Sequence, residues 1–410
     1  MGQSTFPAPS TGASYSSQPP ANASSVLLDG SLVNSASYST TLTGTGASWL
    51  LYANGAGSTT FTLTGITGSP FTVTAGSTIG TPAITGSQSV TVAGPAASGI
   101  PSSFTNTTLP TTTNWGAVAY GGGKWVAVPG SGITASGAYS TTNGTTWSTM
   151  TMPSADSWNG VTYGLVGGTG YFVAIQISGT TNGAYSTNGT TWTASTMPST
   201  SAWFLVGYGN GTFVATQISN TSASAYSTNG TSWTASTMPS ATYWTGIGYG
   251  NGVWVALVGY NITSTVQASS TNGYTWTARG MNDNLYWSAV TYGAGKFVAI
   301  ATGSATYDYS ANGTTWTSGT LPSNVSWYSI AFGNGYFVAV AYGTTAGAYS
   351  TNGTTWTSFT MPSSSNWYSI AYGNNYFNAV SYTNGTVASY YGFTSNPVTY
   401  GIYNGPTATH

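Results

Sequence analysis

Charged side chains are almost absent from this chain of 410 residues: three Lys or Arg and four Asp carry all of the formal charge, 2% of the sequence. An ordinary soluble domain has roughly 25%. Glutamate and cysteine are missing, and the one histidine is His410. These absences remove the usual side chains of acid/base, thiol and metal chemistry. We therefore expect a protein that is not an enzyme and has no metal site and no cofactor.

The scarcity of cations also excludes a class of partner. A nucleic-acid-binding surface needs clustered Lys and Arg, whereas the net charge here is −1, so no nucleic acid is expected as a ligand. No uninterrupted apolar run reaches the length of a membrane helix, and no membrane insertion is expected. Residues 1–24 lack the apolar run of a signal peptide and are expected to form an extended Pro/Ser-rich arm.

Aromatic residues are abundant, with 16 Trp and 30 Tyr, and they lie in repeats. From about residue 104, a Trp-led segment recurs every 40 to 45 residues and ends in an aromatic residue and Gly, as in Trp327–Gly333. Three further short alternating runs follow in each unit, and their period and composition predict β-strands. Four antiparallel strands per repeat, without a helical signal, are typical of a β-propeller blade. The seven opening residues are Trp115, Trp158, Trp203, Trp244, Trp287, Trp327 and Trp367.

Asn-Gly pairs separate the third and fourth strands of the repeats. Such a pair between alternating runs predicts a type I′ hairpin, because that turn needs positive φ at both central residues. The pairs are Asn143-Gly144, Asn188-Gly189, Asn229-Gly230, Asn272-Gly273, Asn312-Gly313 and Asn352-Gly353.

The number of fourth strands predicts how a ring of blades closes. Seven opening segments are followed by only six Asn-Gly hairpins, so one outer strand is missing downstream. The segment Phe104–Pro110 matches Trp192–Pro198, and Phe104 and Trp192 each precede an opening Trp by 11 residues. We therefore predict that the chain supplies the outer strand of the last blade before it begins the first, which leaves no open sheet edge.

The predicted fold class is all-β, with four parts. The extended arm of residues 1–24 precedes a small β-sandwich over residues 25–100, where five short strand patterns are separated by Gly-, Ser- and Asn-rich turns. A seven-bladed β-propeller closed by an N-terminal strand follows over residues 101–393. Residues 394–410 are expected to be a C-terminal tail.

The hairpin segments Ser186–Trp192, Ser227–Trp233 and Ser350–Trp356 resemble the Asp-box hairpin of sialidase-like propellers, with Asn in place of Asp. Sialidase activity is not implied, because that family uses an arginine triad and a Glu that this chain lacks. Over residues 103–393 the repeat also resembles propellers of bacteriophage virion and tail proteins. This resemblance implies a virion structural protein assembled in the host cytoplasm, with the N-terminal region contacting other virion proteins.

Loop lengths indicate a candidate binding face. The connections between second and third strands vary in length, whereas the blade-to-blade connections are fixed, and both lie on the face opposite the Asn-Gly hairpins. Variable loops on a rigid scaffold often carry function. The candidate ligand-binding residues are Gln176, Gln217, Asn220, Tyr260, Asn261, Tyr342 and Tyr382 from variable loops, and Asp156, Asp283 and Asn284 from fixed connections.

Aromatic and amide side chains suit sugars, which stack on rings and hydrogen-bond to amides. The leading interpretation is a non-enzymatic tail fibre or receptor-binding adhesin that recognises a host surface glycan as part of a homo-oligomeric assembly. The alternative is a capsid decoration or head-fibre protein, whose uncharged surface avoids salt-sensitive packing. A third is a glycoside hydrolase that uses Asp156 and Asp283 as its carboxylate pair.

Overall fold

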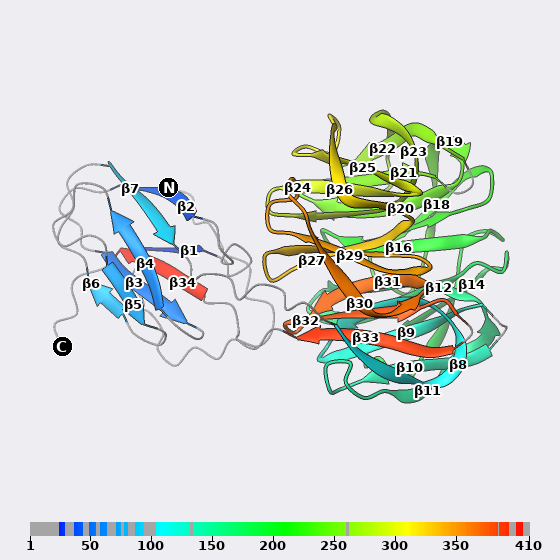
Figure 1. Cartoon of the computed structure of the whole chain (residues 1–410). Coiled ribbons are helices and arrows are strands. Elements are labelled where there is room, and N and C mark those ends of the chain that lie inside the picture. Colours follow the sequence, from blue (N-terminus) through cyan, green and yellow to red (C-terminus); the bar gives the residue numbers. More distant parts are fainter. Residues whose placement is uncertain are drawn as a thin grey trace. The chain divides into compact units, whose positions relative to one another are not determined.

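The computed structural model of the chain is all-β in every region that it describes (Figure 1). The structure describes residues 104–131, 135–259, 262–383 and 385–392 in full, and elsewhere it describes only the backbone of the strands named below. The chain divides into two compact units. The first unit consists of Met1–Ala97 and Ser395–His410, and the second unit consists of Ser98–Thr394. Within these described regions, no helix is long and apolar enough to cross a membrane.

The first unit contains two four-stranded antiparallel sheets. One has the order β1 (Ser24–Leu28), β34 (Thr399–Asn404), β3 (Trp49–Asn54) and β6 (Thr78–Gly80). The other has the order β2 (Ser37–Thr43), β7 (Ser87–Ala93), β4 (Ser58–Leu63) and β5 (Phe71–Thr74). Packing of these sheets as a sandwich stays a prediction. The tail expected over residues 394–410 is corrected, because β34 pairs with β1 on one side and β3 on the other and so joins two strands that would otherwise have unpaired edges.

The second unit consists of four-stranded antiparallel sheets made of consecutive strands. Two long strands, β8 and β23, each begin as the outer strand of one sheet and end as the inner strand of the next. The strands are β8 to β11 (Thr105–Gly121, Lys124–Ser131, Thr134–Ser140, Ser148–Asp156), β12 to β15 (Trp158–Val166, Thr169–Gln176, Asn182–Ser186, Thr193–Thr196), β16 to β19 (Trp203–Gly209, Thr212–Gln217, Thr221–Ser227, Thr234–Thr242), β20 to β23 (Trp244–Gly250, Val253–Val258, Ser264–Ser270, Thr277–Gly293), β24 to β26 (Lys296–Thr302, Ser304–Ser310, Thr317–Val325), β27 to β30 (Trp327–Gly333, Tyr336–Ala341, Thr344–Ser350, Thr357–Ser365) and β31 to β33 (Trp367–Gly373, Tyr376–Ser381, Gly385–Gly392).

The sheet of β31, β32 and β33 is completed by the strand that the sequence predicts. Gly385–Tyr390 of β33 pairs with Thr105–Thr113 of β8. The ring of Phe104 stacks on Phe359 with centroids 5.4 Å apart and lies 5.8 Å from the ring of Tyr391. The inner strands contact one another in the order β8, β12, β16, β20, β23, β27 and β31, and β31 contacts β8. The circuit of inner strands is therefore closed.

The aromatic-Gly ending of each inner strand locks that strand to the next. A Cβ atom at Gly121 would lie 2.0 Å from Cγ of Tyr163, so the tyrosine ring occupies the space that a side chain would need. The same contact closes the circuit, since a Cβ atom at Gly373 would lie 2.2 Å from Cγ of Tyr120. Glycine at these positions is thus required by packing.

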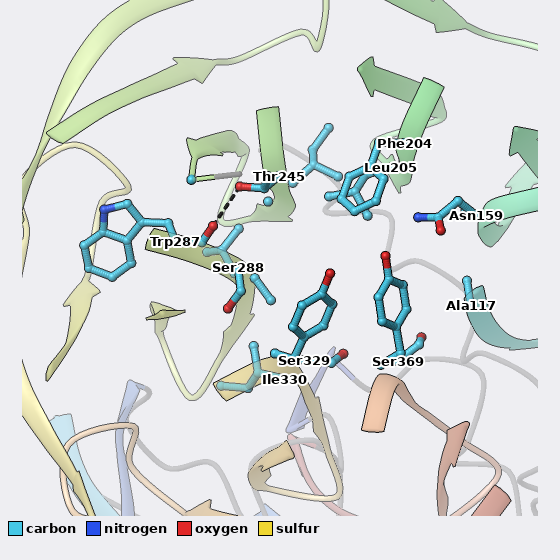
Figure 2. Close-up of a pocket in the computed structure, with 18 of the residues that line it drawn as sticks. Ala117, Asn159, Phe204, Leu205, Thr245, Trp287, Ser288, Ser329, Ile330 and Ser369 are labelled. Carbon is cyan, nitrogen blue, oxygen red and sulfur yellow. Dashed lines mark hydrogen bonds between the residues drawn. The ribbon is translucent and has the colours of Figure 1, made fainter. Parts of the chain in front are cut away.

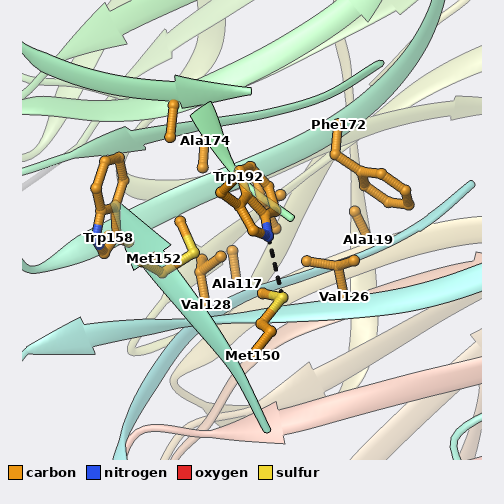
Figure 3. Close-up of a cluster of buried hydrophobic side chains, with 12 residues drawn as sticks. Ala117, Ala119, Val126, Val128, Met150, Met152, Trp158, Phe172, Ala174 and Trp192 are labelled. Carbon is orange, nitrogen blue, oxygen red and sulfur yellow. Dashed lines mark hydrogen bonds between the residues drawn. The ribbon is translucent and has the colours of Figure 1, made fainter. Parts of the chain in front are cut away.

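The hydrophobic cores lie between neighbouring sheets. In the cluster of Figure 3, Trp158 and Phe172 of one sheet pack with Val126 and Val128 of the sheet before it. Large aromatic side chains bury much apolar area, and their polar atoms need a partner. The indole nitrogen of Trp158 donates to the main-chain oxygen of Ser154, and those of Trp203, Trp327 and Trp367 likewise donate to the serine four residues earlier, at 3.0 to 3.2 Å. In these four cases the bond ties the opening Trp to the connection that precedes it.

The turns between third and fourth strands differ from the predicted type I′. In five of the six Asn-Gly pairs only the glycine has positive φ; Asn143-Gly144 alone has both. Side chains provide the hydrogen-bond acceptors within the turn. Oδ1 of Asn188 accepts from the main-chain nitrogens of Thr190 and Thr191 at 2.9 and 2.8 Å. Oγ of Ser186 accepts from the main-chain nitrogen of Gly189 at 2.9 Å. Two-residue turns with positive φ at both centres instead join first and second strands, as at Asn210-Gly211.

Candidate functional site

A cavity of about 660 Å³ opens where the inner strands of the second unit begin. Its walls come from β8, β12, β16, β20, β23, β27 and β31, with loop residues such as Gly259 and Gly303 at the rim. Figure 2 shows Asn159, Phe204, Thr245 and Ser288 around this space. None of the described residues that line it has a charged side chain. The cavity lies at the ends of the sheets opposite the Asn-Gly turns, because antiparallel strands place their first and third turns at the same end.

A register shift in each inner strand turns one residue toward the cavity. The ladder between first and second strands slips directly after the opening Trp, as between Trp158 and Gly160. A bulged residue is left out of the ladder and its side chain is re-aimed. Asn159, Thr245 and Tyr368 occupy this position and line the cavity.

Four tyrosines form a row, and its two central members, Tyr328 and Tyr368, line the cavity. In order they are Tyr342, Tyr328, Tyr368 and Tyr382, with successive ring centroids 5.6, 4.5 and 4.6 Å apart. We call this set the tyrosine row. It also lines a smaller groove of about 290 Å³ together with Thr302 and Ser326. Tyr342 has 37% of its surface exposed, which is high for a tyrosine packed against another ring.

Burial keeps the hydroxyl group of Tyr368 protonated. Desolvation raises the pKa of Tyr368 well above its usual range, and the neighbouring Tyr328 raises this pKa further, while the Asn159 amide lowers it. Tyr368 therefore presents a neutral hydroxyl group that can both donate and accept hydrogen bonds.

Several other polar groups of the cavity wall are used to join neighbouring inner strands. Oγ of Ser369 accepts from the main-chain nitrogen of Val118 at 3.2 Å, and Oγ of Ser329 accepts from that of Ile370 at 3.0 Å. The inner edge of each sheet has main-chain groups without a further strand to pair with. These serines satisfy some of those groups and tie consecutive sheets together.

Thr245 and Ser288 do the same with their hydroxyl protons. Thr245 Oγ1 donates to the main-chain oxygen of Trp287 at 2.7 Å, the bond drawn in Figure 2. Ser288 Oγ lies 2.8 Å from the main-chain oxygen of Trp327 and 3.1 Å from that of Ile300. Their donors are therefore already committed within the protein.

The two glutamines expected to contact a ligand are structural. Gln176 and Gln217 are completely buried at the ends of β13 and β17. Nε2 of Gln176 donates to the main-chain oxygen of Thr180 at 3.0 Å, and Nε2 of Gln217 donates to that of Thr221 at 2.6 Å. Each glutamine braces the loop that follows it.

The other loop candidates have different surroundings. Tyr342 and Tyr382 come together in the tyrosine row. Asn220 and Asn284 are exposed and do not line the cavity. The predictions for Tyr260 and Asn261 lie outside the described residues.

The aspartates are not brought together as a catalytic pair. Asp156 accepts from Ser154 Oγ at 2.6 Å and from Asn182 Nδ2 at 2.8 Å, both within its own connection and the adjoining sheet. Asp283 accepts from Ser318 Oγ and lies beside the completely buried Asp308. Neither Asp156 nor Asp283 lines the cavity. Within the described part of the chain, no group of three or more His, Cys, Asp or Glu side chains could hold a metal ion.

Asn159, Tyr328 and Tyr368 are not among the residues predicted from the sequence, because each follows an opening Trp in a strand whose pattern is typical of a core. A signal for them does exist in the repeats. The position after the opening Trp holds Gly, Asn, Phe, Thr, Ser, Tyr and Tyr in turn, whereas the sixth residue after Trp is always Gly. Variation within an otherwise constant strand marks this position.

No family model and no curated protein matches the sequence. Among solved structures, YCF48 bound to a D1 peptide is similar with a TM-score of 0.55 and 18% identity, over 71% of this chain and 95% of that one. YCF48 from Cyanidioschyzon merolae has a TM-score of 0.53 and 14% identity, over 70% and 98%. Raptor from Chaetomium thermophilum has a TM-score of 0.54 and 7% identity, over 71% of this chain and 29% of that one. At these identities the likeness concerns the fold alone, and together with the all-β sheets it fits a β-propeller.

Proposed function

We propose that the second unit is a closed seven-bladed β-propeller with Asp-box-like hairpins. The closed circuit of seven inner strands supports the blade number, and the contact between Gly373 and Tyr120 supports closure. The hairpins support the second part, since Oδ1 of Asn188 accepts two main-chain amides as an aspartate carboxylate would. The residues that open each blade then surround a common axis.

We further propose that this propeller is the glycan-binding part of a bacteriophage virion protein, a tail fibre or receptor-binding adhesin without enzymatic activity. The observation that carries the glycan proposal is the tyrosine row beside an uncharged cavity. Sugars present apolar faces to aromatic rings and hydroxyl groups to hydroxyl and amide partners. A cavity of about 660 Å³ is within the ordinary size of ligand sites.

The virion assignment rests on the resemblance of the repeats to phage propellers and on the composition. A free protein with net charge near zero tends to associate, and a net charge of −1 over 410 residues suits a subunit of a larger assembly. In this proposal the first unit contacts other virion proteins. Imaging of labelled protein on intact particles tests this placement: a tail position supports the adhesin, and a copy at every capsid position supports decoration instead.

A saccharide array tests the glycan proposal directly. Wild-type protein is expected to bind, and Tyr342→Ala and Tyr382→Ala are expected to weaken binding roughly tenfold each, because each removes a ring from the tyrosine row. Tyr274→Ala is the matched control, since Tyr274 is 43% exposed and packs on Tyr226 in a third-to-fourth-strand turn, away from the cavity. Binding that survives both tyrosine-row variants, or binding of peptides in place of sugars, contradicts the proposal.

A further inference from the structure

One position of each inner strand gives its residue access to the cavity. Elsewhere in the strand, the opening Trp is buried in a core, and the closing Gly receives the aromatic ring of the next strand. The bulged residue after the opening Trp is left out of the ladder, and its side chain is re-aimed. At this position the chain has Gly116, Asn159, Phe204, Thr245, Ser288, Tyr328 and Tyr368, all of which line the cavity.

These seven residues divide the wall of the cavity by chemistry. Tyr328 and Tyr368 form the centre of the tyrosine row. Thr245 and Ser288 have committed their hydroxyl protons to main-chain oxygens, and Gly116 has no side chain to offer. Only Asn159 adds an amide to the cavity wall at this position.

Asn159 presents a buried donor to the cavity. Its side chain is 3% exposed, and its Nδ2 atom has no partner that meets normal hydrogen-bond distance and angle, while a looser interaction with the hydroxyl of Tyr368 lowers the pKa of that group. A buried amide donor without a well-placed partner is costly for the fold. Figure 2 shows this amide nitrogen directed toward the middle of the cavity. A donor held at such a cost and directed into a cavity indicates a ligand atom that accepts from it.

The residues that line the cavity indicate the chemical class of the ligand that carries this acceptor atom. The cavity wall has no cation to pair with a carboxylate or phosphate, and burying an unpaired anion there is costly. A neutral hydroxyl or ether oxygen meets no such penalty. Because inner strands surround the cavity on all sides, a ligand enters along their common axis with one end first. The end of a chain fits this entrance, whereas its middle does not.

We infer that Asn159 and Tyr368 form a specificity subsite for the terminal unit of a neutral saccharide, with the Asn159 amide donating to a sugar oxygen. The inference rests on the proposed glycan-binding function and narrows it to neutral sugars held by their ends. Asn159 touches the ligand in this arrangement, and the tyrosine row supplies the apolar contact.

Binding and stability together test the role of Asn159. Titration calorimetry with the best neutral oligosaccharide from the array is expected to give roughly tenfold weaker binding, or more, for Asn159→Ala and Asn159→Asp. A donor without a partner adds nothing to the fold, so the thermal midpoint of Asn159→Ala is expected to equal or exceed that of wild type. A lowered midpoint with unchanged affinity identifies a structural residue and overturns the inference. Asn159→Asp keeps the size of the side chain if the alanine variant fails to fold.

Sugar chemistry supplies the second arm of the test. In competition experiments, methyl glycosides of neutral hexoses are expected to displace the bound oligosaccharide, whereas sialic acid and glucuronic acid at the same concentration are not. Preference for the acidic sugars, or oligosaccharide binding that Asn159 variants leave intact, overturns the inference while glycan binding stands. A wild-type protein that binds no sugar on the array overturns the proposed function and the inference with it. Tyr274→Ala is again the control expected to bind like wild type.

Discussion

At the scale of the residue, one of the turns between first and second strands contains a residue type that is unfavourable at positive φ. Two-residue turns with positive φ at both centres favour Gly and Asn, and all of these turns but one follow that rule. The exception is Ala294, which has φ of 44° and is exposed. An L-residue with a Cβ atom is strained in this region.

Ala294→Gly is therefore expected to raise the free energy of unfolding by about 0.5 to 1 kcal/mol, because glycine adopts positive φ without strain. The reverse change at an equivalent site is the control: Asn251, with φ of 48°, is expected to lose a similar amount as Asn251→Ala. Urea unfolding measures both. A shift of the same sign in the two variants contradicts the argument.

A second residue-scale feature is the completely buried carboxyl group of Asp308. Positions equivalent to Asp308 hold Ala268 and Ala348 in neighbouring sheets, and both are also buried. Burial raises the pKa of Asp308 to about 6; main-chain hydrogen bonds from Asn282 and Asp283 oppose this shift, and the Asp283 carboxyl group adds to it. Between about pH 4 and 6, the folded protein thus holds a proton on Asp308 that the unfolded chain releases.

The stability contributed by this proton is present in full below about pH 4 and is lost as pH rises through about 6. The loss at neutral pH is roughly 2 to 3 kcal/mol for a shift of this size. Asp308→Asn, which keeps an acceptor for the main chain of Asn282, is expected to recover much of it at pH 7 and to flatten the profile between pH 4 and 6. Thermal unfolding across that range measures the effect. An unchanged slope in the variant argues against a raised pKa.

At the scale of the element, the strands were predictable because alternation and constant spacing survive in every repeat. The positions of the turns were also predictable, but the type I′ turn that Asn188-Gly189 and the equivalent pairs predict was wrong at five of the six sites. Their Ser and Asn side chains cap main-chain amides, which changes the turn that an Asn-Gly pair alone would give.

The site was predictable only in part. Tyr342 and Tyr382 stood out as aromatic residues in loops, whereas Asn159 and Tyr368 were hidden in a strand. They reach the cavity because of a one-residue bulge and because the circuit of inner strands is closed. Neither feature can be predicted from the alternation of apolar and polar residues within one strand. Gln176 and Gln217 were misread for the converse reason, because a loop-end amide binds its own loop as readily as a ligand.

At the scale of the whole molecule, closure of the circuit depends on contacts between distant parts of the chain. Leu109 is completely buried in the core shared by the sheet of β31 to β33 and the sheet of β9 to β11, alongside Trp115 and Val380. The match of Phe104–Pro110 to later repeats revealed this strand. The pairing of β34 could not be predicted from the sequence. Its partners β1 and β3 lie more than three hundred residues earlier, and β34 belongs to no repeat with which it could be compared.

Leu109→Ala is expected to lower the free energy of unfolding by about 2 to 5 kcal/mol, the usual cost of such a cavity. Amide hydrogen exchange is expected to rise first in β33, the partner of this strand. Leu257→Ala is the control, since Leu257 is equally buried but belongs to the core between β21 and β24. If exchange in β33 rises equally in both variants, the strand of residues 105–113 is not what holds that sheet.

The position of β34 has a consequence for the order of synthesis. The sheet of β1, β3 and β6 lacks its second strand until residues 399–404 leave the ribosome, although its other members are translated first. The propeller unit likewise waits for β33 to pair with β8, a segment made about 280 residues earlier. Neither unit can therefore complete its sheets before β31 to β34 have been translated, and the nascent chain carries two unfinished sheets while most of these 410 residues are being made.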